Sequence, residues 1–272
     1  MNVYVSVDME GISGVADWRQ TDPGKDSEDY DHFRALMAQD VNAAVEGALA
    51  AGATGVLVND SHGSMRNVLV TAIHPRAELI SGSPKRMSMV EGLDASFQAV
   101  FMVGYHSRAG SPGVLNHTYS SRVLAECRFN DRPLGETGLN AAVAGHFGVP
   151  VLLVTGDDVV AREAADLLTG VRTVVVKQAL GRYAARCLHP ERTRDLIREA
   201  AGDALAARAG ARPYLPDLPL RVELDFNDSG HAEAAELLPA FERTGERTLA
   251  FTAADALYAY RMARVAIRLA AI

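Results

Sequence analysis

Cysteine is scarce in this chain. Only Cys127 and Cys187 occur, and neither has a partner at Cys-x-x-Cys spacing. A disulfide framework and a thiolate metal site are therefore not expected, and we assign neither cysteine a role. The opening residues also lack the basic and continuously apolar segments of a secretory signal. We therefore expect a protein of the reducing cytoplasm.

Long apolar runs and an excess of positive charge are absent as well. No stretch reaches the roughly 20 apolar residues that a membrane-spanning helix needs. Lys and Arg number 27 against 34 Asp and Glu, which gives a net charge of −7 without a dense basic stripe. This balance disfavours nucleic acid and anionic membranes as partners, because both attract clustered cations. Hydrophobic residues at 48% and charged residues at 22% are instead typical of a chain that folds throughout.

The signature motifs of several protein classes are missing. Neither Gly-x-Gly-x-x-Gly after a strand nor Gly-x-x-x-x-Gly-Lys-Ser/Thr occurs, which disfavours a nucleotide-binding module. The serine-nucleophile elbow Gly-x-Ser-x-Gly is absent too. An interaction module whose carboxylates only cap loops remains open as an alternative to an enzyme.

Apolar, β-branched runs alternate with amphipathic, Ala-rich segments in the first part of the chain. The pattern predicts strands at residues 3–7, 54–58, 100–103 and 151–155, and helices at 31–51, 138–147 and 159–168. Gly52 comes directly after the first helix, where a C-cap is expected. Strands that alternate with helices indicate an α/β fold with a largely parallel sheet flanked by helices.

The same alternation restarts after Val171. It predicts strands at 173–176, 221–226 and 248–251, helices at 190–208, 232–238 and 253–270, and a Pro-rich connector at 212–219. We therefore expect two parts. Residues 1–172 form an N-terminal α/β metal-binding domain, and residues 173–272 form a smaller C-terminal α/β subdomain.

The residues best suited to chemistry lie where predicted strands end. Asp8 and Glu10 follow the first strand, and its period of two directs both carboxylates to one side. His62 and His106 follow the next two strands, and Glu136 lies at the start of a helix. In open parallel sheets, ligands bind beyond the carboxyl ends of the strands. We therefore expect these five side chains to share one site.

Two adjacent carboxylates such as Asp8 and Glu10 repel each other unless a cation holds both. A catalytic zinc ion normally has three protein ligands. The five residues supply three ligands to each of two ions when Asp8 bridges them. Zinc suits imidazole and carboxylate, although manganese, cobalt or iron could occupy the same shell. Two ions about 3.5–4 Å apart can share a hydroxide nucleophile and polarise a carbonyl.

A further histidine, His117, lies in the turn-rich segment 108–119. Its imidazole is our candidate for the catalytic acid or base, because it could donate to an oxyanion or move a proton to a leaving amine near neutral pH. The alternative is an ordinary surface histidine in a loop.

Several of these residues also have structural interpretations. Asp8 alone could cap a turn, and Glu136 could be favoured by the dipole at a helix N-terminus. Asp157 and Asp158 could form a rival metal pair, although capping of the following helix is the favoured role of Asp157. Lys177 could bind a substrate carboxylate or lie on the surface.

Four motifs of this sequence resemble the zinc-dependent D-aminopeptidases of the DppA type, peptidase family M55. They are Val-Asp-Met-Glu-Gly-Ile-Ser-Gly14, Val-Asn-Asp-Ser-His-Gly63, Gly-Tyr-His106 and Gly-Glu-Thr-Gly-Leu-Asn140, and shorter similar stretches continue to Gln178. The resemblance implies two zinc ions per chain held by Asp8, Glu10, His62, His106 and Glu136, with His117 as the catalytic histidine. All six residue types are present.

The resemblance also implies a substrate and an assembly. The substrates would be short peptides with an N-terminal D-residue, such as D-Ala-D-Ala. The enzyme would be a large ring-shaped homo-oligomer, a decamer, that encloses its active sites. A dinuclear phosphoesterase or another amidohydrolase is the alternative, because the same ligands clamp phosphoryl oxygens. The Arg/Lys clamp of such an enzyme is not evident in the sequence.

Overall fold

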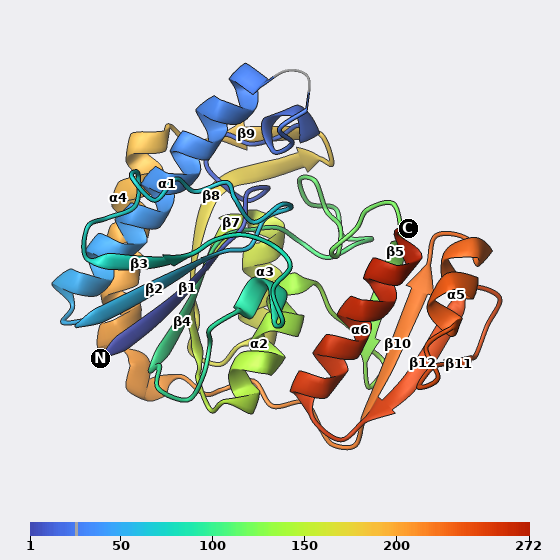
Figure 1. Cartoon of the computed structure of the whole chain (residues 1–272). Helices are drawn as coiled ribbons and strands as arrows, with labels where there is room; N and C mark the ends of the chain where they lie inside the picture. The colour runs from blue at the N-terminus through green and yellow to red at the C-terminus, as the bar shows by residue number, and fades with distance from the viewer. Residues whose placement is uncertain (25–26) are drawn as a thin grey trace.

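A computed structural model describes residues 1–24 and 27–272 (Figure 1). Its larger sheet has seven strands in the order β3-β2-β1-β4-β7-β8-β9. These strands are β1 Asn2–Val7, β2 Gly55–Asp60, β3 Ala77–Ile80, β4 Ala99–Tyr105, β7 Val151–Asp157, β8 Arg172–Gly181 and β9 Ala184–Cys187. All neighbours pair in parallel except β8 and β9. The predicted largely parallel sheet is confirmed.

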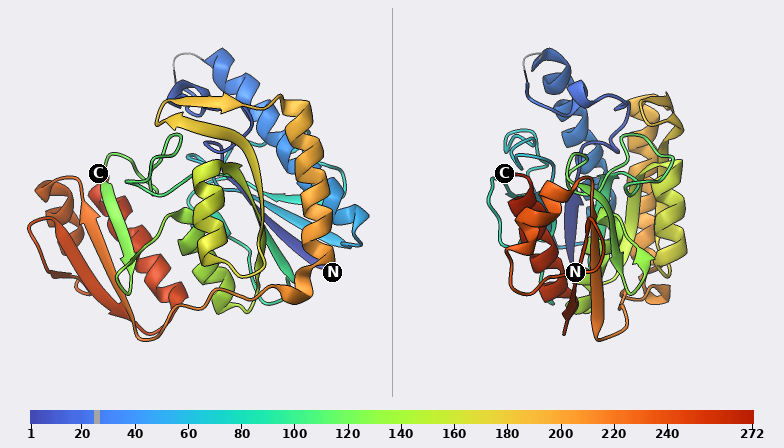
Figure 2. Two further views of the ribbon diagram at one scale, coloured as in Figure 1. Left: turned by 180° about the vertical axis from the view of Figure 1, so that it is seen from behind. Right: turned by 90° about the vertical axis from the view of Figure 1, so that its right-hand side faces the viewer.

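Helices cover both faces of this sheet, which explains why a strand such as β4 is buried along its whole length. Helices α1 Ser27–Ala50 and α4 Pro190–Ala206 pack together on one face (Figure 2). Helices α2 Glu136–His146 and α3 Asp158–Leu167 lie on the other. α1 and α4 approach so closely that a Cβ atom at Gly47 would lie 2.2 Å from the carbonyl oxygen of Arg198. Glycine is therefore required at that crossing.

A second, smaller sheet lies beside the first (Figure 1). Its order is β11-β12-β10-β5-β6, with antiparallel pairing throughout. The strands are β5 Leu124–Phe129, β6 Arg132–Pro133, β10 Leu220–Phe226, β11 Glu242–Arg243 and β12 Thr248–Ala253, and the helices that follow β10 and β12 are α5 Ser229–Glu236 and α6 Ala256–Ala270. Helix α6 contacts both this sheet and α2, so it joins the two layers.

The two sheets do not divide the chain after residue 172. β8, β9 and α4 complete the first sheet and its helical cover, whereas β5 and β6 belong to the second sheet. The reason is a long-range pairing in which Phe129 of β5 lies opposite Val222 of β10. Local periodicity reports the faces of a strand but not its partner, so a linear boundary does not capture this arrangement.

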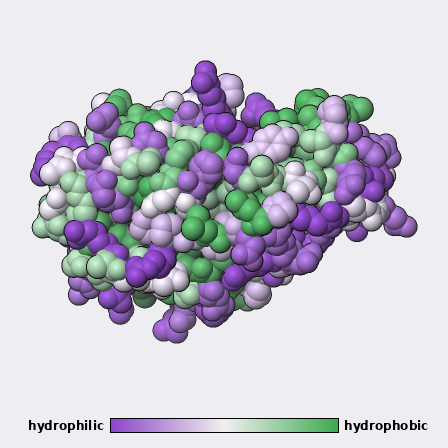
Figure 3. All heavy atoms as spheres, turned by 90° about the horizontal axis from the view of Figure 1, so that it is seen from below, coloured by the Kyte–Doolittle hydropathy of each residue, from purple (hydrophilic) through white to green (hydrophobic). Residues whose placement is uncertain are grey.

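Within residues 1–24 and 27–272, no helix combines the length and the apolar character needed to cross a bilayer. On the face drawn in Figure 3, apolar side chains occur in separate groups among polar ones. Cys127 is buried and Cys187 is exposed, and both are free thiols.

Candidate metal centre

The carboxyl ends of β2, β1 and β4 meet at one edge of the larger sheet, because these strands are parallel neighbours. Asp8 and Glu10 follow β1, His62 follows β2, and His106 follows β4. The first residue of α2, Glu136, faces the same edge. A cavity of about 260 Å³ opens there, and its lining includes Asp8, Glu10, His62, His117 and Glu136. The structure therefore brings the predicted side chains together.

Asp8 lies between two histidines. Its Oδ1 atom is 3.1 Å from Nδ1 of His62, and its Oδ2 atom is 3.3 Å from Nε2 of His106. Each carboxylate oxygen thus points to a different imidazole. This is the geometry that a bridging carboxylate between two adjacent ion sites requires.

Two more carboxylates complete the cluster. Glu10 Oε2 lies 3.0 Å from Nδ1 of His62, and Glu136 Oε1 lies 3.3 Å from Nε2 of His106. Donor atoms of Asp8, Glu10 and His106 all lie within 4.8 Å of one another, and so do those of His106, His117 and Glu136. The two sets adjoin because His106 belongs to both.

The cluster is buried and partly unsatisfied. Asp8, Glu10 and His106 are each 2% exposed. Within the described chain, Asp8 Oδ2, Glu10 Oε2 and His106 Nε2 have no hydrogen-bond partner. Buried polar and charged atoms without partners are costly. Divalent cations would satisfy all three atoms, so these residues fit a metal centre.

The acids and imidazoles shift each other's pKa in opposite directions. Burial raises the pKa of Asp8, but the adjacent imidazoles of His106 and His62 hold it well below its usual range. Burial lowers the pKa of His62 and His106, but the charges of Glu10 and Glu136, respectively, raise them well above their ordinary value. Without metal, the imidazoles carry the protons that balance the carboxylates. Metal ions compete with those protons for the same nitrogen atoms.

Outer hydrogen bonds orient the nitrogen atoms that face the cluster. His62 Nε2 lies 2.8 Å from the carbonyl oxygen of Thr21, and His106 Nδ1 lies 3.0 Å from that of Ser107. A carbonyl oxygen only accepts, so His62 Nε2 and His106 Nδ1 each carry a proton. The other ring nitrogens, His62 Nδ1 and His106 Nε2, therefore face the carboxylates of the cluster. The support at metal-ligating histidines in other proteins is of this kind.

His117 faces the same centre from its loop. Its Nδ1 atom donates to the carbonyl oxygen of Leu115 at 2.9 Å, which leaves Nε2 3.9 Å from Glu10 Oε1 and 3.8 Å from Glu136 Oε1. The ring stacks on His106 with centroids 4.1 Å apart. Burial and the charge of His106 lower the pKa of His117. The interpretation as a surface histidine is therefore wrong.

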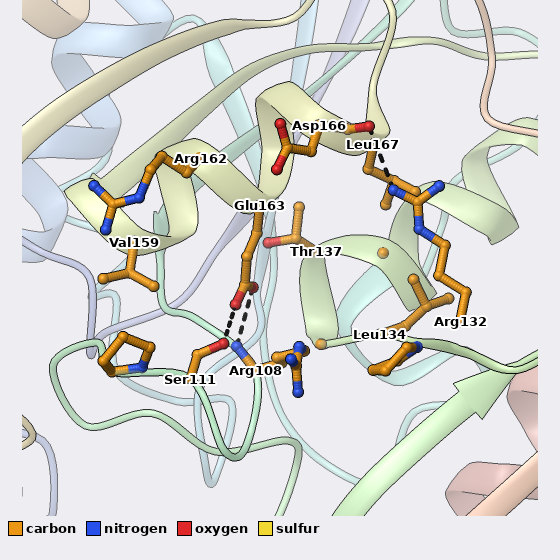
Figure 4. A pocket seen from close by; sticks show the side chains of 14 residues that line it. Arg108, Ser111, Arg132, Leu134, Thr137, Val159, Arg162, Glu163, Asp166 and Leu167 are labelled. Atoms are coloured by element: carbon orange, nitrogen blue, oxygen red, sulfur yellow. Dashed lines mark hydrogen bonds between the residues drawn. The ribbon is translucent and has the colours of Figure 1, made fainter.

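The loop that carries His117 is tied to α3. Glu163 accepts hydrogen bonds from the backbone N–H of Arg108, at 3.1 Å, and from the hydroxyl of Ser111, as Figure 4 shows. A separate cavity of about 370 Å³ opens at this contact, and none of the six predicted site residues lines it. Glu163, Ser111 and Arg108 belong to the lining of this cavity, and their hydrogen bonds support the loop.

Asp157 caps the N-terminus of α3, which confirms the role that the sequence favoured for it. One carboxylate oxygen accepts from the N–H groups of Val159 and Val160 at the start of α3, and the other accepts from Val114 at 2.7 Å. A carboxylate saturated by backbone donors is not available as a metal ligand. The rival metal pair of Asp157 and Asp158 is thus wrong.

Lys177 has a role that the sequence did not reveal. The residue is 1% exposed, and its Nζ atom donates to the carbonyl oxygens of Glu10, Ile12 and Val15 at 2.5, 3.0 and 2.6 Å. Both expected roles, on the surface or against a substrate carboxylate, are therefore wrong. Lys177 holds the backbone turn that presents Glu10. No local pattern around a single lysine signals such a contact.

Three carboxylates and three imidazoles around a cavity at the carboxyl edge of a parallel sheet define a metal-dependent hydrolase of the α/β class. The family model for peptidase M55, described as D-aminopeptidase, matches residues 1–265. The chain therefore belongs to the M55 family of D-aminopeptidases, and the predicted family and activity are confirmed.

Two relatives cover nearly the whole chain. The D-aminopeptidase of Bacillus subtilis (strain 168) is 44% identical over 274 residues, which are 99% of this chain and 98% of the relative. A solved structure, the Zn-dependent D-aminopeptidase DppA from Bacillus subtilis, a self-compartmentalizing protease, matches with a TM-score of 0.96 and 43% identity, covering 100% of this chain and 98% of that chain. At this level of similarity, the chain and the solved relative share the same fold.

Proposed function

We propose that this chain removes N-terminal D-residues from short peptides such as D-Ala-D-Ala at a centre of two zinc ions. The position of Asp8 between His62 and His106, at 3.1 and 3.3 Å, carries the proposal, because one carboxylate serves both halves of the cluster. Zinc is the metal that the solved relative's description gives. Imidazole and carboxylate together suit it.

Each ion would have three protein ligands. Asp8, Glu10 and His62 would hold one, and Asp8, His106 and Glu136 would hold the other. This division follows the short contacts of Glu10 to His62 and of Glu136 to His106. When bound, the ions would supply Lewis acidity. This polarises the scissile carbonyl and lowers the pKa of the attacking water toward neutral pH.

His117 would move the proton. Its Nδ1–H is engaged with the Leu115 carbonyl, so Nε2 is the atom free to accept a proton and to pass it to the amine nitrogen of the leaving residue. Burial and the charge of His106 lower the pKa of His117, which favours the unprotonated Nε2 that a base requires. The stacked His106 ring fixes the plane in which Nε2 points.

The test is a stereochemical pair combined with metal analysis. Purified protein should contain about two equivalents of a divalent transition metal per chain, as expected for a two-ion site. It should hydrolyse D-Ala-D-Ala in preference to L-Ala-L-Ala, lose this activity after chelation and regain it with zinc. Metal content near zero, or turnover of phosphoesters without turnover of peptides, would contradict the proposal.

We also propose that the chain works in the cytoplasm as a ring-shaped homo-oligomer, a decamer, that encloses its active sites. The support is the solved relative, which is described as self-compartmentalizing and is similar along the whole chain. Sedimentation velocity of the purified protein measures the assembly directly. A monomer at micromolar concentration would rule out the ring.

A further inference from the structure

A second cavity adjoins the metal centre. It has a volume of about 490 Å³ and shares four lining residues with the cavity of the cluster: Gly63, Met65, Ser88 and Arg264. A molecule bound at the cluster can therefore extend past these residues into the second cavity. We call the second cavity the basic cavity, because its lining is strongly cationic.

The basic cavity concentrates positive charge in a chain whose net charge is −7. Its lining includes Lys85, Arg86, Arg261, Arg264 and Arg268, and no described acidic residue belongs to it. Three of these arginines lie on one face of α6, spaced three and four residues apart. Like charges at this spacing repel, so they favour an anion between them.

Arg264 is the member that reaches the metal centre, because it alone among these cations lines both cavities. Its Nε atom is buried and, in the part of the chain that the structure describes, has no hydrogen-bond partner. Arg128 on β5 shows the usual alternative, since it pairs with Glu126, Glu223 and Asp225. Buried donors are almost always satisfied, so the free Nε indicates a missing acceptor.

The guanidinium group of Arg264 is held in place by an aromatic ring. Its central carbon lies 3.8 Å from the centroid of the Tyr119 ring. The backbone N–H of Tyr119 donates to Glu136 Oε1 at 2.7 Å. Through Tyr119, the position of the guanidinium is thus linked to a carboxylate of the metal cluster. A preorganised cation next to the reacting centre is suited to bind a charged group of the substrate.

We propose that Arg264 binds the C-terminal carboxylate of a dipeptide substrate, an inference that rests on the aminopeptidase function proposed above. A guanidinium binds a carboxylate through two parallel hydrogen bonds. An extended chain advances about 3.5 Å per residue, so the carboxylate of a dipeptide lies one residue beyond the scissile bond. Arg261 and Arg268 line only the basic cavity and strengthen its positive potential. The enzyme is therefore selective for short peptides with a free C-terminus.

The experiment compares D-Ala-D-Ala with its C-terminal amide, which lacks the negative charge but keeps the scissile bond. Arg264→Gln should raise KM for the free acid by about 10- to 100-fold, the usual effect of losing a hydrogen bond to a charged group, and should raise KM for the amide far less. Arg264→Lys should restore part of the loss. Arg172→Gln is the control, because it removes an exposed arginine at the opposite end of the sheet, where β8 begins. It should leave KM and kcat/KM unchanged for both substrates.

A binding measurement separates this inference from the proposed function. Calorimetric titration with the D-Ala-D-Ala analogue whose peptide bond is reduced to CH₂–NH requires no turnover. Arg264→Gln should weaken binding of the free-acid analogue and not of its amide. Equal affinity of the unsubstituted protein for both analogues would overturn the inference. The inference would also be overturned if Arg264→Gln weakened binding of the free-acid analogue and of its amide equally. This holds whether or not the variant changes the sedimentation of the assembly. Failure to hydrolyse any D-peptide would contradict the proposed function alone.

Discussion

Lys177 on β8 donates a hydrogen bond of 2.5 Å to the backbone carbonyl of Glu10, which follows β1. The two strands are not neighbours, because β4 and β7 lie between them. A buried ammonium group thus reaches across the edge of the sheet to the turn that presents Glu10, a carboxylate of the proposed metal centre. The loop after β1 owes its shape to a residue far along the chain.

Replacing Lys177 by Met should loosen that turn. Three carbonyl oxygens, those of Glu10, Ile12 and Val15, would lose their common donor. Because outer-shell partners tune metal affinity by about 10- to 100-fold, we expect zinc to be released at lower chelator concentration by a factor in that range. Competition with a chromogenic chelator measures it. Unchanged zinc affinity in a folded variant would show that Lys177 serves only packing.

Removing Asp8 should empty both ion sites, whereas removing Glu136 should spare one. Asp8 contacts both His62 and His106, while Glu136 contacts only the His106 side. We therefore expect metal content to fall from about two equivalents to near zero in Asp8→Ala and to about one in Glu136→Ala, because a site with two ligands holds zinc poorly. Elemental analysis after dialysis distinguishes the variants. Equal metal loss in both would exclude Asp8 as the bridge.

Replacing His117 by Ala should slow turnover by about 10² or more, the usual contribution of a positioned acid or base. Metal content should stay at about two equivalents, because the three ligands proposed for each ion remain. The joint measurement is necessary because His117 also lies within ligand distance of His106 and Glu136. Loss of one ion would make His117 a ligand instead, and unchanged turnover would leave it without a role in catalysis.

Stability should depend on pH through Asp40. This carboxyl is buried on α1 and accepts from the N–H and hydroxyl of Ser13 at 3.0 and 2.8 Å. Burial raises its pKa from 3.8 to about 6. Between these two pH values, Asp40 is ionised in the unfolded chain but still protonated in the folded protein. Asp40 therefore contributes stability below about pH 4, and this contribution is lost as the pH rises through 6.

Asp40→Asn removes this dependence because its amide does not titrate. The free energy of unfolding of the variant, relative to the unsubstituted protein, should therefore rise by about 3 kcal/mol between pH 4 and pH 8. Urea unfolding at several pH values measures the difference, and Asp203→Asn, at an exposed position of α4, is the matched control. A difference that stays constant with pH would contradict the prediction.

Local pattern was sufficient for the elements that fold against their own neighbours in sequence. The period of two along β1 placed Asp8 and Glu10 on one side, and the alternation of strands and helices predicted that the ends of β1, β2 and β4 meet. Asp157 was predicted as a helix cap because it directly precedes a predicted helix, and the N–H groups that donate to it lie within three residues. These features depend on geometry within a few residues of each side chain, which the order of residue types reports directly.

Tertiary structure alone decided the contacts between distant segments. The pairing of β5 with β10, the reach of Lys177 to Glu10, and the stacking of Arg264 on Tyr119 each join residues more than ninety positions apart. The sequence around a lysine or an arginine does not show whether its side chain lies on the surface or in a buried site. What distinguishes the two is which segment packs against it, and this is set by the cooperative burial of whole sheets and helices rather than by any local preference.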